Sequence, residues 1–84
     1  MIEIYTTDIC GYCEAAKKLL QNKSLKYKEI NMTNDKSLQL EIINKTGLKT
    51  VPQIFIDGKH IGGFNELRNL SITGKLDLLI DKVS

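Results

Sequence analysis

The chain has 84 residues, of which 42% are hydrophobic and 26% are charged, and its formal net charge at pH 7 is +2. This size and composition are typical of one soluble globular domain, which we expect to span residues 1–84. The net charge is too small to favour nucleic-acid binding, and no apolar run approaches the roughly 20 residues of a membrane-spanning helix. The sequence begins with a strand-like segment rather than a secretory leader, so we expect a cytoplasmic protein without nucleic-acid or membrane partners.

The first third of the chain predicts a β-α-β unit. Residues 2–6 alternate in polarity and are rich in β-branched residues, which favours a strand. From Gly11 the pattern becomes helical, with apolar residues on one face: Ala16, Leu19 and Leu20. Residues 26–31 follow as a second, partly exposed strand. A helical crossover between them makes these two strands parallel.

A second helix is predicted after the second strand. Thr33 or Asn34 can cap its start, since a short polar side chain there accepts a hydrogen bond from a free backbone N–H. The helix then runs to about Lys45, and Gly47 ends it.

The third and fourth strands are predicted to form a hairpin. Residues 53–56 form the third strand and residues 59–61 the fourth. Asp57-Gly58 between them is the strongest turn signal in the chain, so the two strands should be antiparallel.

Two short helices are predicted to complete the chain. Asn65 is a plausible cap for the first, which continues through Leu70. After Gly74, apolar residues at helical spacing indicate the last helix: Leu76, Leu79, Ile80 and Val83. The order β-α-β-α-β-β-α-α predicts an α/β fold, with a small mixed four-stranded sheet flanked by helices.

The only two cysteines, Cys10 and Cys13, lie three residues apart between the first strand and the first helix. A four-ligand zinc site would need two more Cys or His residues close together, but the only histidine is His60, to which we assign no role. A CxxC pair in this position therefore favours redox chemistry. The alternative is a pair of buried reduced cysteines that only fill space.

The two cysteines are not equivalent. At a helix start, residues i and i+3 lie on one face, within reach of a disulfide after small adjustments. Cys10 lies just outside the first turn, where free N–H groups and the helix dipole favour a thiolate, whereas Cys13 lies one turn in. We interpret Cys10 as the nucleophile and Cys13 as the resolving thiol.

Several short motifs occur in a characteristic order: Tyr5-Thr6, Cys10-Gly11-Tyr12-Cys13, Thr50-Val51-Pro52 and Gly62-Gly63. With this set the whole chain resembles a glutaredoxin. The resemblance implies a thioredoxin-like fold in a monomer that binds glutathione. It also implies reduction of disulfide-containing and glutathionylated proteins with glutathione as the reductant.

The resemblance also implies a glutathione site. The bond before Pro52 is expected to be cis, which exposes the Val51 backbone for pairing with an extended peptide. The γ-glutamyl carboxylate is expected near the helix start after the double glycine. The implied glutathione-binding residues are Tyr12, Gln39, Thr50, Val51, Pro52, Gly63, Phe64 and Asn65. Several also have a simpler explanation when taken singly. Pro52 could only begin a strand, and the double glycine could be an ordinary turn. Tyr12 could be a packing residue, and Gln39 could lie on a solvated helix face.

Three positions depart from the family's common pattern. Thr7 replaces a frequent Lys three residues before the first Cys, and Asn65 replaces a frequent Asp, for which Glu66 could substitute. Both changes bear on how tightly glutathione binds. Gly11 stands where proline is common in the family and leaves a free backbone N–H.

Relatives with a small residue at the position of Gly11 can hold a [2Fe–2S] cluster between two subunits. In that arrangement each subunit gives its first Cys, here Cys10, and two glutathiones complete the ligands. The chain would then be a dimer, but the retained Cys13 favours exchange chemistry. A third alternative is a redoxin reduced by a flavin enzyme; such proteins carry a Trp-containing signature, and this chain has no Trp.

Overall fold

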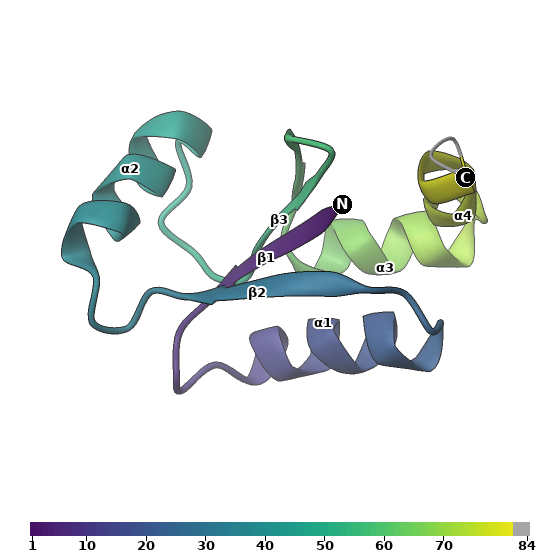
Figure 1. Cartoon of the computed structure of the whole chain (residues 1–84), viewed down its shortest axis with the longest axis horizontal. Coiled ribbons are helices and arrows are strands. Elements are labelled where there is room, and N and C mark those ends of the chain that lie inside the picture. Colours follow the sequence, from purple (N-terminus) through teal and green to yellow (C-terminus); the bar gives the residue numbers. More distant parts are fainter. Residues whose placement is uncertain (82–84) are drawn as a thin grey trace.

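The computed structural model describes residues 1–81, and the eight elements follow the order predicted from the sequence. Helices lie on both faces of one sheet (Figure 1). The elements are β1 (Ile2–Thr6), α1 (Gly11–Asn22), β2 (Tyr27–Asn31), α2 (Lys36–Thr46), β3 (Gln53–Ile56), β4 (Lys59–Gly62), α3 (Phe64–Ile72) and α4 (Lys75–Asp81). Val83, expected in the last helix, lies outside the described residues.

The sheet has the strand order β2-β1-β3-β4. Strand β1 pairs in parallel with β2 and antiparallel with β3, as the crossover and the hairpin predict. The hairpin between β3 and β4 turns at Asp57 and Gly58, whose φ angles of 51° and 81° are both left-handed. Such a turn matches the right-handed twist of the flanking strands, which explains the Asp-Gly pair. The predicted mixed sheet is therefore confirmed.

Side chains of each strand alternate between the two faces of the sheet. In β1, Ile2 and Ile4 point to the face covered by α1 and α3, whereas Tyr5 points to the face that carries α2. The larger buried cluster lies on the α1 face and contains Ile2, Ile4, Ala16, Leu20, Ile54, Ile56, Leu67 and Leu76. The smaller cluster on the α2 face contains Met32, Ile42 and Phe55.

Both predicted N-caps were wrong by one or two residues. Asp35 caps α2 and accepts a hydrogen bond from the Leu38 N–H at 3.0 Å. Thr33 instead accepts one from the Asp8 N–H at 2.7 Å, so its hydroxyl ties two loops together. The predicted end of α2 is confirmed, since Gly47 adopts the left-handed conformation with a φ angle of 75°.

The start of α3 is Gly63 rather than Asn65. The Gly63 N–H donates to the Glu66 carboxylate at 2.7 Å, which is the side-chain half of a capping interaction. This places the helix start directly after β4 and brings the backbone of Gly63 next to the loop that precedes β3. None of the helices within residues 1–81 is long and apolar enough to cross a bilayer.

Candidate functional site

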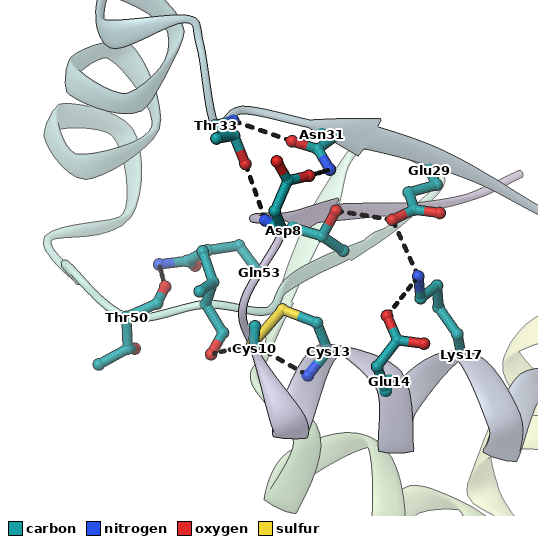
Figure 2. The surroundings of a disulfide bond; sticks show 12 residues. Asp8, Cys10, Cys13, Glu14, Lys17, Glu29, Asn31, Thr33, Thr50 and Gln53 are labelled. Atoms are coloured by element: carbon teal, nitrogen blue, oxygen red, sulfur yellow. Dashed lines mark hydrogen bonds and ion pairs between the residues drawn. A yellow bond between two sulfur atoms is a disulfide. The ribbon is translucent and has the colours of Figure 1, made fainter.

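The cysteine pair lies at the N-terminus of α1, where the chain turns back from the end of β1 (Figure 2). Cys10 is the N-cap residue, with extended φ and ψ angles of −154° and 102°, and its sulfur accepts a hydrogen bond from the Cys13 N–H at 3.1 Å. The two sulfurs form a disulfide, and the Cα atoms lie 5.2 Å apart. A donor N–H and the helix dipole thus act on the Cys10 sulfur, as a stabilised thiolate requires.

The two sulfurs differ in accessibility. Cys13 is completely buried, with 0% exposure, and lies in the same stripe of α1 as Ala16 and Leu20. Cys10 is only half-buried. An incoming thiol can therefore reach the Cys10 sulfur, and Cys13 is the enclosed partner. This difference agrees with the interpretation of Cys10 as the nucleophile.

The loop before β3 contributes backbone polar groups beside the disulfide. The Val51 carbonyl oxygen lies 3.7 Å from the Cys10 sulfur. The Val51–Pro52 peptide bond is cis, as expected from the resemblance. Within residues 1–81 the Val51 N–H donates no hydrogen bond, so it is available to a ligand that approaches Cys10.

A cleft of about 250 Å³ runs from this loop to the start of α3. Its lining consists of Tyr12, Thr50, Val51, Pro52, Gly63, Phe64, Asn65 and Glu66. Seven of the eight residues that the resemblance implies for glutathione thus line one surface. The Tyr12 side chain is 64% exposed, and its ring centroid lies 6.0 Å from that of Phe64.

Gly63 lies where the start of α3 meets the loop before β3. A Cβ atom at Gly63 would lie 3.5 Å from the Pro52 carbonyl oxygen, so any side chain there would be in contact with the loop. The first N–H groups of a helix have no partner within the helix and point out of its N-terminus. The first residues of α3 line the cleft, so these N–H groups lie at its edge. The cleft therefore offers backbone donors at both ends.

Gln39 is the one implied residue outside the cleft. It lines a neighbouring cavity of about 110 Å³ together with Thr7 and Lys49. Thr50 and Val51 line both cavities, so the two are adjacent. The Gln39 amide donates to the Met32 carbonyl oxygen at 2.5 Å, and this bond holds its side chain toward the end of β2.

Gln53 is a functional candidate that the sequence reading missed. Its side chain is only 1% exposed, and its amide donates to the carbonyl oxygens of Leu48 at 3.1 Å and Thr50 at 2.9 Å. Its carbonyl oxygen lies 2.7 Å from His60 Nε2. Because both amide hydrogens are used by the loop, the oxygen must accept, so His60 carries a proton on Nε2. The only signal in the sequence was a polar residue at the start of an otherwise apolar strand.

A polar cluster links α1 to β2 close to the disulfide (Figure 2). Lys17 forms ion pairs with Glu14 at 2.7 Å and Glu29 at 3.1 Å, and the Thr6 hydroxyl donates to Glu29 at 2.8 Å. The hydrogen bonds to Glu14 and Glu29 raise the pKa of Lys17. The ammonium charge is thereby held on the helix that carries both cysteines.

A metal site within one copy of the chain would need several His, Cys, Asp or Glu side chains close together. Within residues 1–81, no group of three or more His, Cys, Asp and Glu side chains is placed to hold a metal ion. A shared cluster would need only Cys10 from each copy, and an added Cβ at Gly11 beside it would meet no atom within 4 Å. The cluster alternative therefore stays a prediction.

The chain is similar to known proteins along most of its length. The family model "Glutaredoxin" matches residues 2–61. Glutaredoxin 3 of Escherichia coli (strain K12) is 43% identical over 79 residues, covering 94% of this chain and 95% of that protein. Glutaredoxin 1 of Rickettsia typhi is 48% identical over 82 residues, covering 95% of this chain and 79% of that protein. Among solved structures, a buckwheat glutaredoxin–glutathione complex has a TM-score of 0.91 at 31% identity, covering 96% of this chain and 76% of the other.

Proposed function

The chain belongs to the glutaredoxin family, and on this premise we propose that it is a glutathione-dependent oxidoreductase that reduces protein disulfides and glutathione mixed disulfides. The family and the Cys10–Cys13 pair make it a thiol–disulfide oxidoreductase. The observation that carries the finer proposal is the half-buried Cys10 sulfur, which lies 3.7 Å from the Val51 carbonyl at one end of a peptide-sized cleft. Its partner sulfur is buried, so reaction must begin at Cys10.

In the proposed cycle the Cys10 thiolate attacks one sulfur of a substrate disulfide. A bond forms between Cys10 and that sulfur, the substrate's S–S bond breaks, and the second substrate sulfur leaves as a thiolate that takes up a proton. Cys13 then loses its proton and attacks the Cys10 sulfur, which forms the intramolecular disulfide and releases the first substrate sulfur. The substrate gains two electrons, and the protein's dithiol is oxidised.

Two glutathione molecules restore the dithiol. The first attacks the Cys10 sulfur as a thiolate, which releases Cys13 and leaves glutathione bound to Cys10. The second attacks the sulfur of that bound glutathione, which releases Cys10 and oxidised glutathione. A glutathionylated substrate enters this sequence directly, so Cys10 alone should suffice for it.

The cleft supports glutathione as the reductant. An extended peptide bound to Cys10 can pair with the Val51 N–H and C=O, which is strand addition through backbone hydrogen bonds. A carboxylate at the other end would meet the N-terminus of α3, where the N–H groups of Phe64 and Asn65 remain as donors because Glu66 occupies that of Gly63. Tyr12 would cover the ligand from the α1 side.

The proposal is tested with the wild type, Cys10→Ser and Cys13→Ser. The measurement is glutathione-dependent reduction of a small glutathione mixed disulfide, together with reduction of a disulfide-bonded peptide. We expect Cys10→Ser to lose both activities by at least about a thousandfold, because the attacking thiolate is gone. Cys13→Ser should keep the first activity and lose most of the second.

Inactivity of the wild type with glutathione would contradict the proposal. The next measurements would then be reduction by a flavin-containing reductase and anaerobic reconstitution with iron and sulfide, which test the two alternatives. We further propose that the reduced protein works in the cytoplasm as a monomer and dimerises only if a cluster forms. Sedimentation of the reduced and the reconstituted protein distinguishes these states.

A further inference from the structure

Ile9, directly before the reactive cysteine, is an apolar residue held in solvent. Its side chain is 98% exposed, more than any other large apolar side chain within residues 1–81. It packs on neither of the two apolar clusters and lines neither the cleft beside Cys10 nor the cavity next to it. A single exposed apolar residue is common, but this one adjoins the atom at which the reaction takes place.

The loop that carries Ile9 is fixed by hydrogen bonds of its neighbour, Asp8 (Figure 2). The Asp8 N–H donates to the Thr33 hydroxyl at 2.7 Å, and the Asp8 carboxylate accepts from the Asn31 amide at 2.8 Å. Asn31 in turn accepts from the Thr33 N–H at 2.9 Å, which closes the network. These hydrogen bonds join the loop after β1, directly before Ile9 in the chain, to the end of β2.

From these observations we infer that Ile9 is a docking residue for polypeptide substrates that carry an apolar side chain beside their reactive cysteine. Adjacent Cα atoms are about 3.8 Å apart, so the Cα atom of Ile9 lies about that far from the Cα atom of Cys10, and a polypeptide whose sulfur bonds to Cys10 meets the loop that carries Ile9. Tyr12, two residues after Cys10, is a second exposed apolar side chain, and it lines the cleft. A partner of matching polarity buries both side chains when it reacts.

This inference rests on the proposed oxidoreductase function and adds the class of substrate. Ile9 does not line the cleft between Val51 and Gly63, in which we propose that glutathione binds. A protein substrate is larger and must also cover the loop in front of Cys10. We therefore expect Ile9 to contact a polypeptide substrate, which covers the loop, and not glutathione, which binds in the cleft. Both react at the same Cys10 sulfur.

The test uses two synthetic cyclic disulfide peptides that differ only in having Leu or Ser next to each cysteine. The measured quantity is the ratio of their kcat/KM values, each normalised to the rate with a small glutathione mixed disulfide. We expect the wild type to prefer the Leu peptide by about fivefold to tenfold, which corresponds to burying roughly half of an aliphatic side chain. Ile9→Ser should bring the ratio close to one, and Ile9→Val should restore most of it.

Ile72→Ser is the matched control, because Ile72 is 68% exposed and lies at the far end of α3 from the cysteines. It should leave the wild-type ratio unchanged. Retention of the Leu preference in Ile9→Ser would overturn the inference, as would an equal loss of the preference in Ile72→Ser. An inactive wild type with the small mixed disulfide would instead contradict the proposed function, so the two failures are distinguishable.

Discussion

The two faces of the sheet hold the site in different ways. On the face covered by α1 and α3, eight buried apolar residues form one cluster. On the face that carries α2, the buried cluster has three members, and the buried amide of Gln53 lies beside it. Helix α1 buries Cys13, Ala16 and Leu20, whereas α2 buries only Ile42.

Each face positions one half of the site. The buried cysteine belongs to the stripe that packs α1 on the sheet, so apolar packing fixes the redox pair. The Val51 loop lies on the α2 face, which has the smaller cluster, and is held by the hydrogen bonds of Gln53 to Leu48 and Thr50. The position of the redox pair therefore depends on the large core, whereas the position of the Val51 loop depends on a few directional hydrogen bonds, and each can be perturbed separately.

The largest loss of stability should come from a cavity in the larger cluster, on the face covered by α1 and α3. Leu20→Ala removes a completely buried side chain from the larger cluster, and we expect a loss of about 3–5 kcal/mol in the free energy of unfolding. Ile42→Ala on the α2 face should lose about 2 kcal/mol, because fewer buried neighbours surround the cavity. Urea unfolding at neutral pH measures both; equal losses would show that the faces do not differ in this way.

Gln53→Leu should lose less stability than Leu20→Ala but should weaken glutathione binding. The carbonyls of Leu48 and Thr50 and the His60 Nε2–H would lose their partner, and we expect a loss of about 1–3 kcal/mol in the free energy of unfolding. Because the loop would no longer be held, KM for glutathione should rise several-fold while kcat falls less.

The matched control for this variant is Gln21→Leu. The Gln21 amide donates to the Tyr27 hydroxyl at 2.8 Å on the exposed surface of the α1 face, far from the loop. The KM of Gln21→Leu for glutathione should equal that of the wild type. If Gln53→Leu raised KM no more than Gln21→Leu, Gln53 would be a core residue without a role in positioning the loop.

The sequence predicted the elements better than their ends. Alternation and helical periodicity are local properties, so all eight elements and the mixed sheet followed from them. The caps did not follow, because Thr33, Asn34 and Asp35 are all good N-cap residues. A tertiary contact, the hydrogen bond from the Asp8 N–H, engages the Thr33 hydroxyl, and periodicity holds no information about such a contact.

The site shows the same limit. The segments around Tyr12, Val51 and Gly63 were assigned together by family resemblance, and the structure brings them to one cleft. The role of Gln53 required knowing that the loop and His60 meet on one face of the sheet. That meeting depends on the strand order and on the hairpin, so residue spacing alone could not reveal it.

The smallest expected effect is a loss of stability at alkaline pH, to which one titratable group on each face of the sheet contributes. Lys17 lies on the α1 side, where its hydrogen bonds to Glu14 and Glu29 raise its pKa. Tyr5 lies on the α2 side, where burial chiefly raises its pKa and the negative charges nearby add to the shift. Both groups therefore bind their protons more tightly in the folded protein than in the unfolded chain.

The two raised pKa values make the folded protein less stable at alkaline pH. A raised pKa stabilises the folded state below the unfolded value, about 10 for both groups, and this stabilisation disappears as the pH rises through the folded value. We expect the urea midpoint to fall between about pH 9 and pH 11, and Lys17→Met and Tyr5→Phe each to reduce that fall. The two reductions should add, because the side chains lie on opposite faces of the sheet and share no partner. A double variant whose alkaline fall equals that of either single variant would show that the two faces respond to alkali as one unit.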